Sequence, residues 1–374
     1  MTDDALPEPD RIADAPHPRE TPRLFGQNPA EAAFLQAFTA GRLHHAWMLS
    51  GPRGVGKATL AWRIARFLAS QPVESGGDMF GAPPSPTTLD TDPDHPVYRR
   101  SLALAEPGIV LCRRPWDEKT KRLRTAITVE EVRKLKSQFT LSATDGGWRV
   151  AIIDAMDEMN TAAANALLKL LEEPPERTVF LLVCHQPGRL LPTIRSRCRE
   201  LRLSRLSADA LSEALAQAGF AVDGDAEALA ELSAGSAGEA VRLATEGGLA
   251  LYGEMIARLG EVPNMNRAAL SRLADQATGR DAVTRYDLMI RLVDLILTRL
   301  ARRGATGQDA PEAAPQEAAT LARLAPSPAA AIAWAELSET LAKRIGHARG
   351  VNLDPGQVML DTFLHVDATA RRLI

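Results

Sequence analysis

Eight consecutive residues have the glycine spacing and the lysine of a phosphate-binding loop: Gly51-Pro52-Arg53-Gly54-Val55-Gly56-Lys57-Ala58. In the pattern G-x-x-x-x-G-K-[ST], the glycines let backbone N–H groups converge on a phosphate, and the lysine contacts the outer phosphates. The last position, where a hydroxyl normally binds Mg²⁺, is Ala58. Thr59 comes too late, because one helical step turns its side chain by about 100°. We therefore predict a degenerate nucleotide site at Gly51, Gly54, Gly56 and Lys57, with impaired Mg²⁺-assisted hydrolysis.

A second motif, Val150-Ala151-Ile152-Ile153-Asp154, consists of four apolar residues followed by an acid. This Walker-B pattern is typical of a central parallel strand that carries a carboxylate at its C-terminal end. The next residue in an ATPase is usually the acid that polarises the attacking water, but here it is Ala155. We assign Asp154 to the nucleotide site, with a helix cap or a solvated strand end as the alternative.

The surrounding elements can position these residues. Ala46-Trp47-Met48-Leu49-Ser50 is an apolar run typical of a buried strand, and a helical pattern follows the loop over residues 58–68. Residues 178–184 form another apolar run that predicts a buried strand. Strand, glycine-rich loop and helix in this order place a helix N-terminus at the phosphate, which favours negative charge. The pattern predicts an α/β fold with a parallel sheet flanked by helices.

Further motifs follow the second strand in a fixed order. A run that reads LLK-x-LEEPP covers residues 167–175, the strand at 178–184 comes next, and Ser196-Arg197-Cys198 follows it. Gly26-Gln27 and residues 41–46 precede the loop. Together these motifs resemble the AAA+ clamp-loader subunits of DNA replication, over roughly residues 23–245. The resemblance implies an AAA+ P-loop domain, a small helical lid and an all-helical C-terminal collar domain.

Three departures indicate which kind of clamp-loader subunit the chain resembles. Hydrolysing gamma/tau subunits carry a P-loop hydroxyl, an Asp-Glu pair after the Walker-B strand and a sensor arginine in a Gly-Ser-x-Arg pattern. This chain has Ala58, Ala155 and Gly238 at those places. It therefore looks like the delta-prime type, a non-hydrolysing stator, in which we expect any bound ATP or ADP not to be turned over.

The resemblance also implies one remaining catalytic residue. The arginine of the S-R-C triplet, Arg197 here, is expected to reach the ATP of a neighbouring gamma/tau subunit. A guanidinium supplied in trans can stabilise charge on a transferring phosphoryl group. For Arg195 and Arg199 we expect surface ion pairs instead. The implied partners are the gamma/tau and delta subunits, with the sliding clamp and primed DNA reached through the complex.

Two other readings remain open. An ATP-hydrolysing gamma/tau-like motor subunit would need Thr59 and Glu158 to replace the missing groups. A nucleic-acid-binding module would use the basic stretches at 113–114, 119–124 and 133–136, although a solvated charged face is the favoured interpretation. A formal net charge of −3 over 374 residues argues against strong DNA binding by the chain alone.

The cysteines give no ligand set for a zinc ion. Bacterial clamp-loader domains commonly carry a four-cysteine zinc module before the Walker-B strand. The chain has three cysteines, Cys112, Cys184 and Cys198, and none forms a C-x-x-C pair. We expect no zinc, a reshaped insertion at about 75–121, and a turn rather than a metal site where Asp92, Asp94 and His95 lie close together.

The expected organisation follows from composition and periodicity. Residues 1–22 are acidic and Pro-rich and predict a disordered tail without a signal peptide. Few cysteines and the lack of a long apolar run indicate a cytoplasmic protein. The predicted domains are an AAA+ P-loop domain over 23–203, a helical lid over 204–250 and a helical oligomerisation domain over 251–374. Within the last, helical patterns cover 286–302, 329–345 and 357–364, with a loop over 303–319.

Overall fold

The structure is a computed structural model, and it describes residues 7–12, 15–72, 85–141, 146–220, 226–263, 265–278 and 282–373. The chain divides into two compact units. The first contains residues 1–221 together with 236–238, and the second contains 222–235 together with 239–374. The two units are described separately below.

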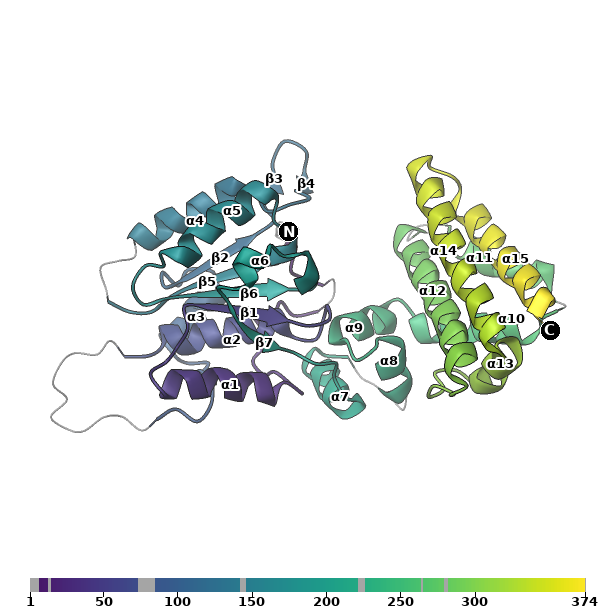
Figure 1. The fold of residues 1–374 in the computed structure, drawn as a ribbon, viewed down its shortest axis with the longest axis horizontal. Helices are drawn as coiled ribbons and strands as arrows, with labels where there is room; N and C mark the ends of the chain where they lie inside the picture. Colours follow the sequence, from purple (N-terminus) through teal and green to yellow (C-terminus); the bar gives the residue numbers. More distant parts are fainter. Residues whose placement is uncertain are drawn as a thin grey trace, which may run out of the picture. The chain divides into compact units, whose positions relative to one another are not determined.

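A five-stranded parallel sheet forms the centre of the first unit (Figure 1). Its spatial order is β2-β5-β6-β1-β7. The strands are β1 (Ala46–Ser50), β2 (Ile109–Arg113), β5 (Arg149–Asp154), β6 (Thr178–Cys184) and β7 (Arg199–Arg202). Because all pairings are parallel, the carboxyl ends of the strands share one edge of the sheet, where α/β folds bind ligands.

Helices cover both faces of this sheet (Figure 1). One face packs against α1 (Asn28–Thr39) and α2 (Lys57–Ala69), and the other against α4 (Val129–Leu141) and α5 (Thr161–Glu172). The remaining elements of this unit are shorter: α3 (Pro96–Leu102), β3 (Trp116–Asp117), β4 (Arg122–Leu123), η1 (Met156–Glu158), η2 (Pro187–Arg189), α6 (Pro192–Arg195) and α7 (Ala208–Gln217). The predicted α/β fold with helices on both sides of a parallel sheet is confirmed.

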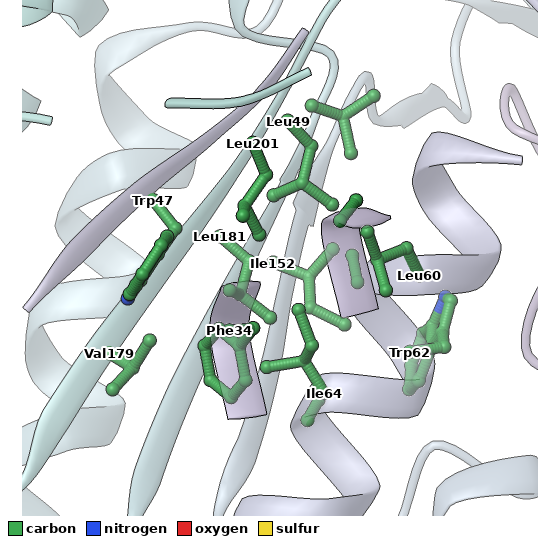
Figure 2. Close-up of a cluster of buried hydrophobic side chains, with 14 of the residues drawn as sticks. Phe34, Trp47, Leu49, Leu60, Trp62, Ile64, Ile152, Val179, Leu181 and Leu201 are labelled. Carbon is green, nitrogen blue, oxygen red and sulfur yellow. The ribbon is translucent and has the colours of Figure 1, made fainter. Parts of the chain in front are cut away.

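Alternation along the central strand explains how two cores form. Ala46 and Met48 of β1 face the layer of α4 and α5, whereas Trp47 and Leu49 face the layer of α1 and α2. Figure 2 shows the second of these cores, where Phe34 and Trp47 meet with ring centroids 5.1 Å apart. Strands buried on both faces are continuous apolar runs, which is why β1 and β6 have the bounds predicted from the sequence.

Residues 75–84 of the predicted insertion at 75–121 lie outside the described residues. Residues 85–121 of it are described, and they include α3 and β2, which is an edge strand of the main sheet. In the described part of the insertion and just after it, the antiparallel pair β3–β4 forms a small separate hairpin. Strand β2 alternates between half-buried and buried residues, so it lacks the continuous apolar run that identified the central strands.

The turn at Asp92 is confirmed. The Asp92 carboxylate accepts a hydrogen bond from Asp94 N at 2.8 Å, and His95 Nδ1 accepts one from Val97 N at the start of α3. Among the residues that the structure describes, no group of three or more His, Cys, Asp or Glu side chains could hold a metal ion. The three cysteines are free, and burial raises the pKa of each thiol to about 12.

The prediction of a disordered tail over 1–22 is wrong for the described part of that segment. Residues 7–12 and 15–22 are placed, and the His17 side chain is completely buried. The segment is rich in charge, as the prediction assumed, but its charges pair with one another and with Arg113 of β2. Polar composition predicts disorder only where such charges find no buried partners.

The second unit is helical. It contains α8 (Ala226–Leu232), most of α9 (Ala237–Thr245), α10 (Gly248–Gly260), α11 (Arg267–Asp275), α12 (Ala282–Thr306), α13 (Glu317–Leu324), α14 (Pro328–Gly350) and α15 (Pro355–Leu373). The predicted helices lie in α12, α14 and α15, and the predicted loop over 303–319 shortens to the residues between α12 and α13. In the described part of the chain, no helix is long and apolar enough to cross a membrane.

The predicted lid over 204–250 coincides with neither unit. Helix α7 belongs to the first unit, whereas α8 and residues 239–245 of α9 belong to the second. Ser207 caps α7 as the sequence indicated, since its side chain accepts a hydrogen bond from Ala210 N. The lid and the oligomerisation domain remain predictions.

Candidate nucleotide site

The phosphate-binding loop joins β1 to α2 with the backbone that its glycines permit. Gly54 has φ +77° and Gly56 has φ +99°, values that residues with a Cβ atom rarely adopt. A Cβ on Gly51 would lie 2.4 Å from the carbonyl oxygen of Leu203, so that glycine is also required for close approach. The loop therefore has the geometry expected from its sequence, with Gly56 as the residue that caps α2.

Lys57 is buried and does not point freely out of the loop. Only 3% of the residue is exposed, and its ammonium group donates hydrogen bonds to Gly51 O at 2.7 Å and to Pro52 O. Burial lowers the pKa of Lys57 to about 8, against the opposing influence of the Asp154 and Asp157 carboxylates. The lysine thus satisfies the loop's own carbonyl groups, at the place where phosphate oxygens would otherwise accept these bonds.

Asp154 ends β5 close to this lysine. Burial raises the pKa of Asp154 to about 7, the charges of Asp10 and Glu158 act in the same direction, and Lys57 opposes them. Ala155, which follows it, is a buried methyl group with no acid–base chemistry. Lys57 and Asp154 are thus near enough for their charges to influence each other, and the position of the catalytic acid carries no functional group.

The two residues that a motor subunit would need as substitutes are engaged elsewhere. Thr59 is buried within α2, one residue past the metal position. Glu158 lies in η1 and forms an ion pair with Arg114 at 2.7 Å. Neither side chain is placed to replace the hydroxyl of the loop or the acid after the strand.

Three residues at the carboxyl edge of the sheet were not assigned to the nucleotide site from the sequence. Arg113 ends β2 directly beside Asp154 in the parallel register. Asp157 accepts a hydrogen bond from His185 N, just past β6, at 2.8 Å. Burial and the charge of Lys57 lower the pKa of His185. Recognition of residues 109–113 as a strand would have placed Arg113 at this edge, since parallel strands end together.

The glycine at the sensor position lies against the loop. Gly238 N donates a hydrogen bond to Gly54 O at 3.2 Å, and both residues belong to the first unit. A Cβ on Gly238 would lie 3.2 Å from the Gly54 Cα atom and 2.7 Å from Ile12 Cδ1. The space that a sensor arginine would need is therefore already filled by the chain itself.

Arg197 follows α6 and is partly exposed. Its guanidinium donates to Thr193 O at 2.9 Å and forms an ion pair with Glu172, at the end of α5, also at 2.9 Å. Its side chain retains 38% of its accessible surface. Arg195 is exposed, and the Arg199 guanidinium carbon lies 5.0 Å from the centroid of the Trp47 ring. Among the described residues, Arg199 thus makes a cation–π contact in place of the expected ion pair.

The part of the sequence that forms this site is similar to known proteins. The family described as DNA polymerase III, delta subunit, matches residues 26–207. A DNA polymerase III subunit delta' from Pseudomonas aeruginosa is 39% identical over 196 residues, which are 52% of this chain and 53% of the relative. The matched segment belongs to the DNA polymerase III clamp-loader family. This clamp-loader segment contains the phosphate-binding loop, Asp154 and Arg197.

Relatives of both kinds of clamp-loader subunit match this segment. A DNA polymerase III subunit gamma from Buchnera aphidicola is 32% identical over 191 residues, 51% of this chain and 46% of the relative. The chain thus spans about half the length of the curated relatives it matches. A crystal structure of a DNA polymerase III gamma subunit-related protein from Thermotoga maritima aligns with 91% of this chain and 99% of that chain, at 15% identity and TM-score 0.43. The fold assignment rests on the order of the parallel strands and on the loop geometry.

Proposed function

We propose that the chain is a non-hydrolysing, delta-prime type subunit of the DNA polymerase III clamp loader. In this role it joins gamma/tau and delta subunits and helps them load the sliding clamp onto primed DNA. The delta' relative supports this assignment at 39% identity, above the 32% of the gamma relative. The difference is small, so the choice between the two subunit types depends on the residues of the site.

One observation carries the proposal: the nucleotide site lacks three functional groups at once. The residues concerned are Ala58, Ala155 and Gly238, where a hydrolysing subunit needs a metal-binding hydroxyl, a catalytic acid and a sensor cation. Phosphoryl transfer depends on positioning and on charge stabilisation by these groups, so their joint loss removes most of the means of catalysis. No turnover is proposed for this site, whether ATP or ADP enters it or not, and no zinc ion is proposed.

Arg197 is the catalytic group that we assign to the chain. Its side chain is partly exposed and makes one ion pair across the surface, with Glu172. Exposed ion pairs are worth only about 0–1 kcal/mol, so a phosphate group from a neighbouring subunit can displace Glu172 at small cost. The planar guanidinium would then bind two phosphate oxygens and stabilise the charge that develops on them.

The reading as a motor subunit has less support, because Thr59 is buried and Glu158 is paired with Arg114. The interpretation as a DNA-binding module, which rests on basic residues, is weakened as well. In the β3–β4 hairpin, Lys121 pairs with Glu118 and Arg124 pairs with Asp117, so acids within the hairpin offset much of its positive charge.

ATP hydrolysis by the purified chain and by its Lys57→Ala variant separates the two subunit types. We expect no turnover by either protein, with a hydrolysing gamma/tau subunit measured alongside as the positive control. Turnover that disappears in the Lys57→Ala variant would make the chain a motor subunit. In a reconstituted complex, Lys57→Ala should also leave clamp loading nearly unchanged.

A further inference from the structure

A segment before the first helix lies across α2 and is hydrogen-bonded to it. Two buried arginines of α2 bind its backbone: Arg66 donates to Arg19 O at 2.6 Å and Arg63 donates to Pro22 O at 2.7 Å. We call residues 7–12 and 15–24 the N-terminal strap. Its last residue, Leu24, lies against the phosphate-binding loop, because a Cβ on Gly56 would be 2.5 Å from Leu24 Cδ1.

The beginning of the strap carries an acidic pair that binds Arg113. Glu8 accepts hydrogen bonds from Arg19 at 2.7 Å and from Arg113 at 2.9 Å, and Asp10 accepts one from Arg113. Asp10 also lies 3.1 Å from the buried His17 ring. Burial tends to raise the pKa of Glu8, but the arginine hydrogen bonds outweigh it and hold this pKa at about 2. Burial also tends to raise the pKa of Asp10, but His17 and Arg113 lower it overall, so both carboxylates are anionic at neutral pH.

This part of the strap runs along the carboxyl edge of the sheet, beside the nucleotide site. Arg113 ends β2 beside Asp154, and Asp10 is close enough to Asp154 for its charge to raise that residue's pKa. From there the strap reaches Ile12, whose side chain lies against Gly238, and Gly238 is hydrogen-bonded to Gly54 of the phosphate-binding loop. Residues 8–12 thus connect the end of the Walker-B strand to the sensor position and the loop, the groups between which a P-loop protein holds nucleotide phosphates.

We propose that residues 8–12 of the N-terminal strap cover the degenerate nucleotide site of this chain, held at one end by Arg113 beside Asp154 and placed at the other with Ile12 against Gly238. The proposal goes beyond the proposed function, because a site that does not hydrolyse ATP could equally be open or hold nucleotide. The absence of a side chain at Gly238 then has a second consequence. It removes a sensor cation, and it also leaves the space that Ile12 fills.

Coverage by the strap makes nucleotide binding a competition. The apparent affinity of a ligand equals its affinity for the open site multiplied by the fraction of molecules whose site is open. If the strap is in place in more than about 99% of molecules, nucleotide binding is weakened at least ~100-fold. Release of the strap would free Arg113 for an anionic ligand and open the space that Ile12 fills beside the loop.

The test is equilibrium binding of a fluorescent ATP analogue to three forms of the full chain, in EDTA because the loop lacks its metal-binding hydroxyl. These are the natural chain, a variant without residues 1–12, and the double variant Glu8→Gln/Asp10→Asn. We expect the deletion to tighten binding by about 100-fold and the double variant by a smaller factor. Asp92→Asn/Asp94→Asn, which removes the same charge from a surface turn, should behave like the natural chain.

Two further measurements keep the result interpretable. Lys57→Ala in the deletion background should abolish the gained binding if the analogue enters the phosphate-binding loop. A synthetic peptide of residues 1–24 should displace the analogue from the deletion variant. Far-UV circular dichroism checks folding, and the double variant stands in for the deletion if that protein is unfolded. The proposal is overturned if neither variant binds the analogue more tightly than the natural chain does. That result would not bear on Arg197, which is tested in the assembled complex.

Discussion

At the scale of single residues, the loop lysine and the strand carboxylate are both poised near neutrality. Burial brings the pKa of Lys57 down to about 8 and that of Asp154 up to about 7. In an active P-loop protein, Mg²⁺ and phosphates would provide these groups with charged partners. Here the lysine hydrogen-bonds to backbone carbonyls of its own loop, and the carboxylate faces the like charge of Asp10.

A pH dependence of stability follows from Asp154. Its pKa in the folded chain, about 7, lies above the usual 3.8, so the folded state holds this proton more tightly. The natural chain should therefore lose stability from this group as pH rises from about 4 to 7, whereas Asp154→Asn should not. Because one pKa unit corresponds to about 1.4 kcal/mol, the advantage of the variant should grow by about 3 kcal/mol between pH 5 and pH 8.5. Urea unfolding at the two pH values measures the free energy of unfolding of both proteins. A difference between them that stays constant with pH would contradict the raised pKa of Asp154.

The residues of the site also show what could be predicted from the sequence. The spacing of Gly51, Gly54, Gly56 and Lys57 predicted the loop, because a P-loop is a local structure that its own residues determine. The arrival of Asp10 beside the same site depends on contacts between residues about 100 positions apart, such as Asp10 with Arg113. No local pattern carries that information, which is why the segment was predicted to be disordered.

At the scale of elements, one glutamine joins three parts of the first unit. Gln27, at the start of α1, donates to Val55 O at 3.2 Å and to Ser204 O at 2.8 Å, and accepts from Ser204 N at 3.1 Å. The residue is 2% exposed, so these bonds are shielded from water. They connect the start of α1, the phosphate-binding loop and the segment after β7.

Gln27→Ala should destabilise the first unit by about 2–3 kcal/mol, since it leaves buried backbone groups without partners. Chemical denaturation followed by tryptophan fluorescence can measure this change, because Trp47 and Trp62 lie in the adjacent core. Gln36→Ala, an exposed position on the same helix, serves as the control and should change stability by less than about 0.5 kcal/mol. Equal effects of the two substitutions would show that Gln27 does not join these elements.

The elements that were predicted less well share one property. Strands β1 and β6 are buried on both faces and have uninterrupted apolar sequences. Strand β2, at the edge of the sheet, alternates half-buried and buried residues and ends in Arg113. Its sequence therefore looked like part of a polar insertion, and its place in the sheet follows only from pairing with β5.

In the helical unit, a buried charge cluster should contribute to stability. Glu317 is 1% exposed, forms an ion pair with Arg299 at 2.7 Å and accepts a hydrogen bond from the Tyr252 hydroxyl. Glu317→Gln should lower the free energy of unfolding by about 3 kcal/mol, because it removes the nearer and more deeply buried of the two carboxylates paired with Arg299 and leaves Glu231 at 3.5 Å. Tyr252→Phe should cost only about 1 kcal/mol. Thermal unfolding of both variants measures the two losses of stability. Equal losses would show that the cluster is not buried in solution.

At the scale of the whole molecule, the proposal assigns the two units different tasks. The first presents Arg197 and contains a nucleotide site that the strap covers. The second is a bundle of helices, the part that the resemblance to clamp loaders assigns to subunit assembly. A net charge of −3 gives the chain no general attraction for DNA, so contact with primed DNA is expected through the complex.

The most direct test of the account is the ATPase rate of a reconstituted clamp-loader complex that contains Arg197→Ala. A trans-acting arginine is worth roughly 10³–10⁵ in rate, so the neighbouring site should become nearly silent, and the complex should lose that site's share of turnover. Arg195→Ala, at an exposed arginine two residues away, is the matched control and should keep the natural rate. Both variants should assemble normally by size-exclusion chromatography. An Arg197→Ala complex that assembles and hydrolyses ATP at the natural rate would contradict the assignment of this chain as the subunit that supplies the arginine.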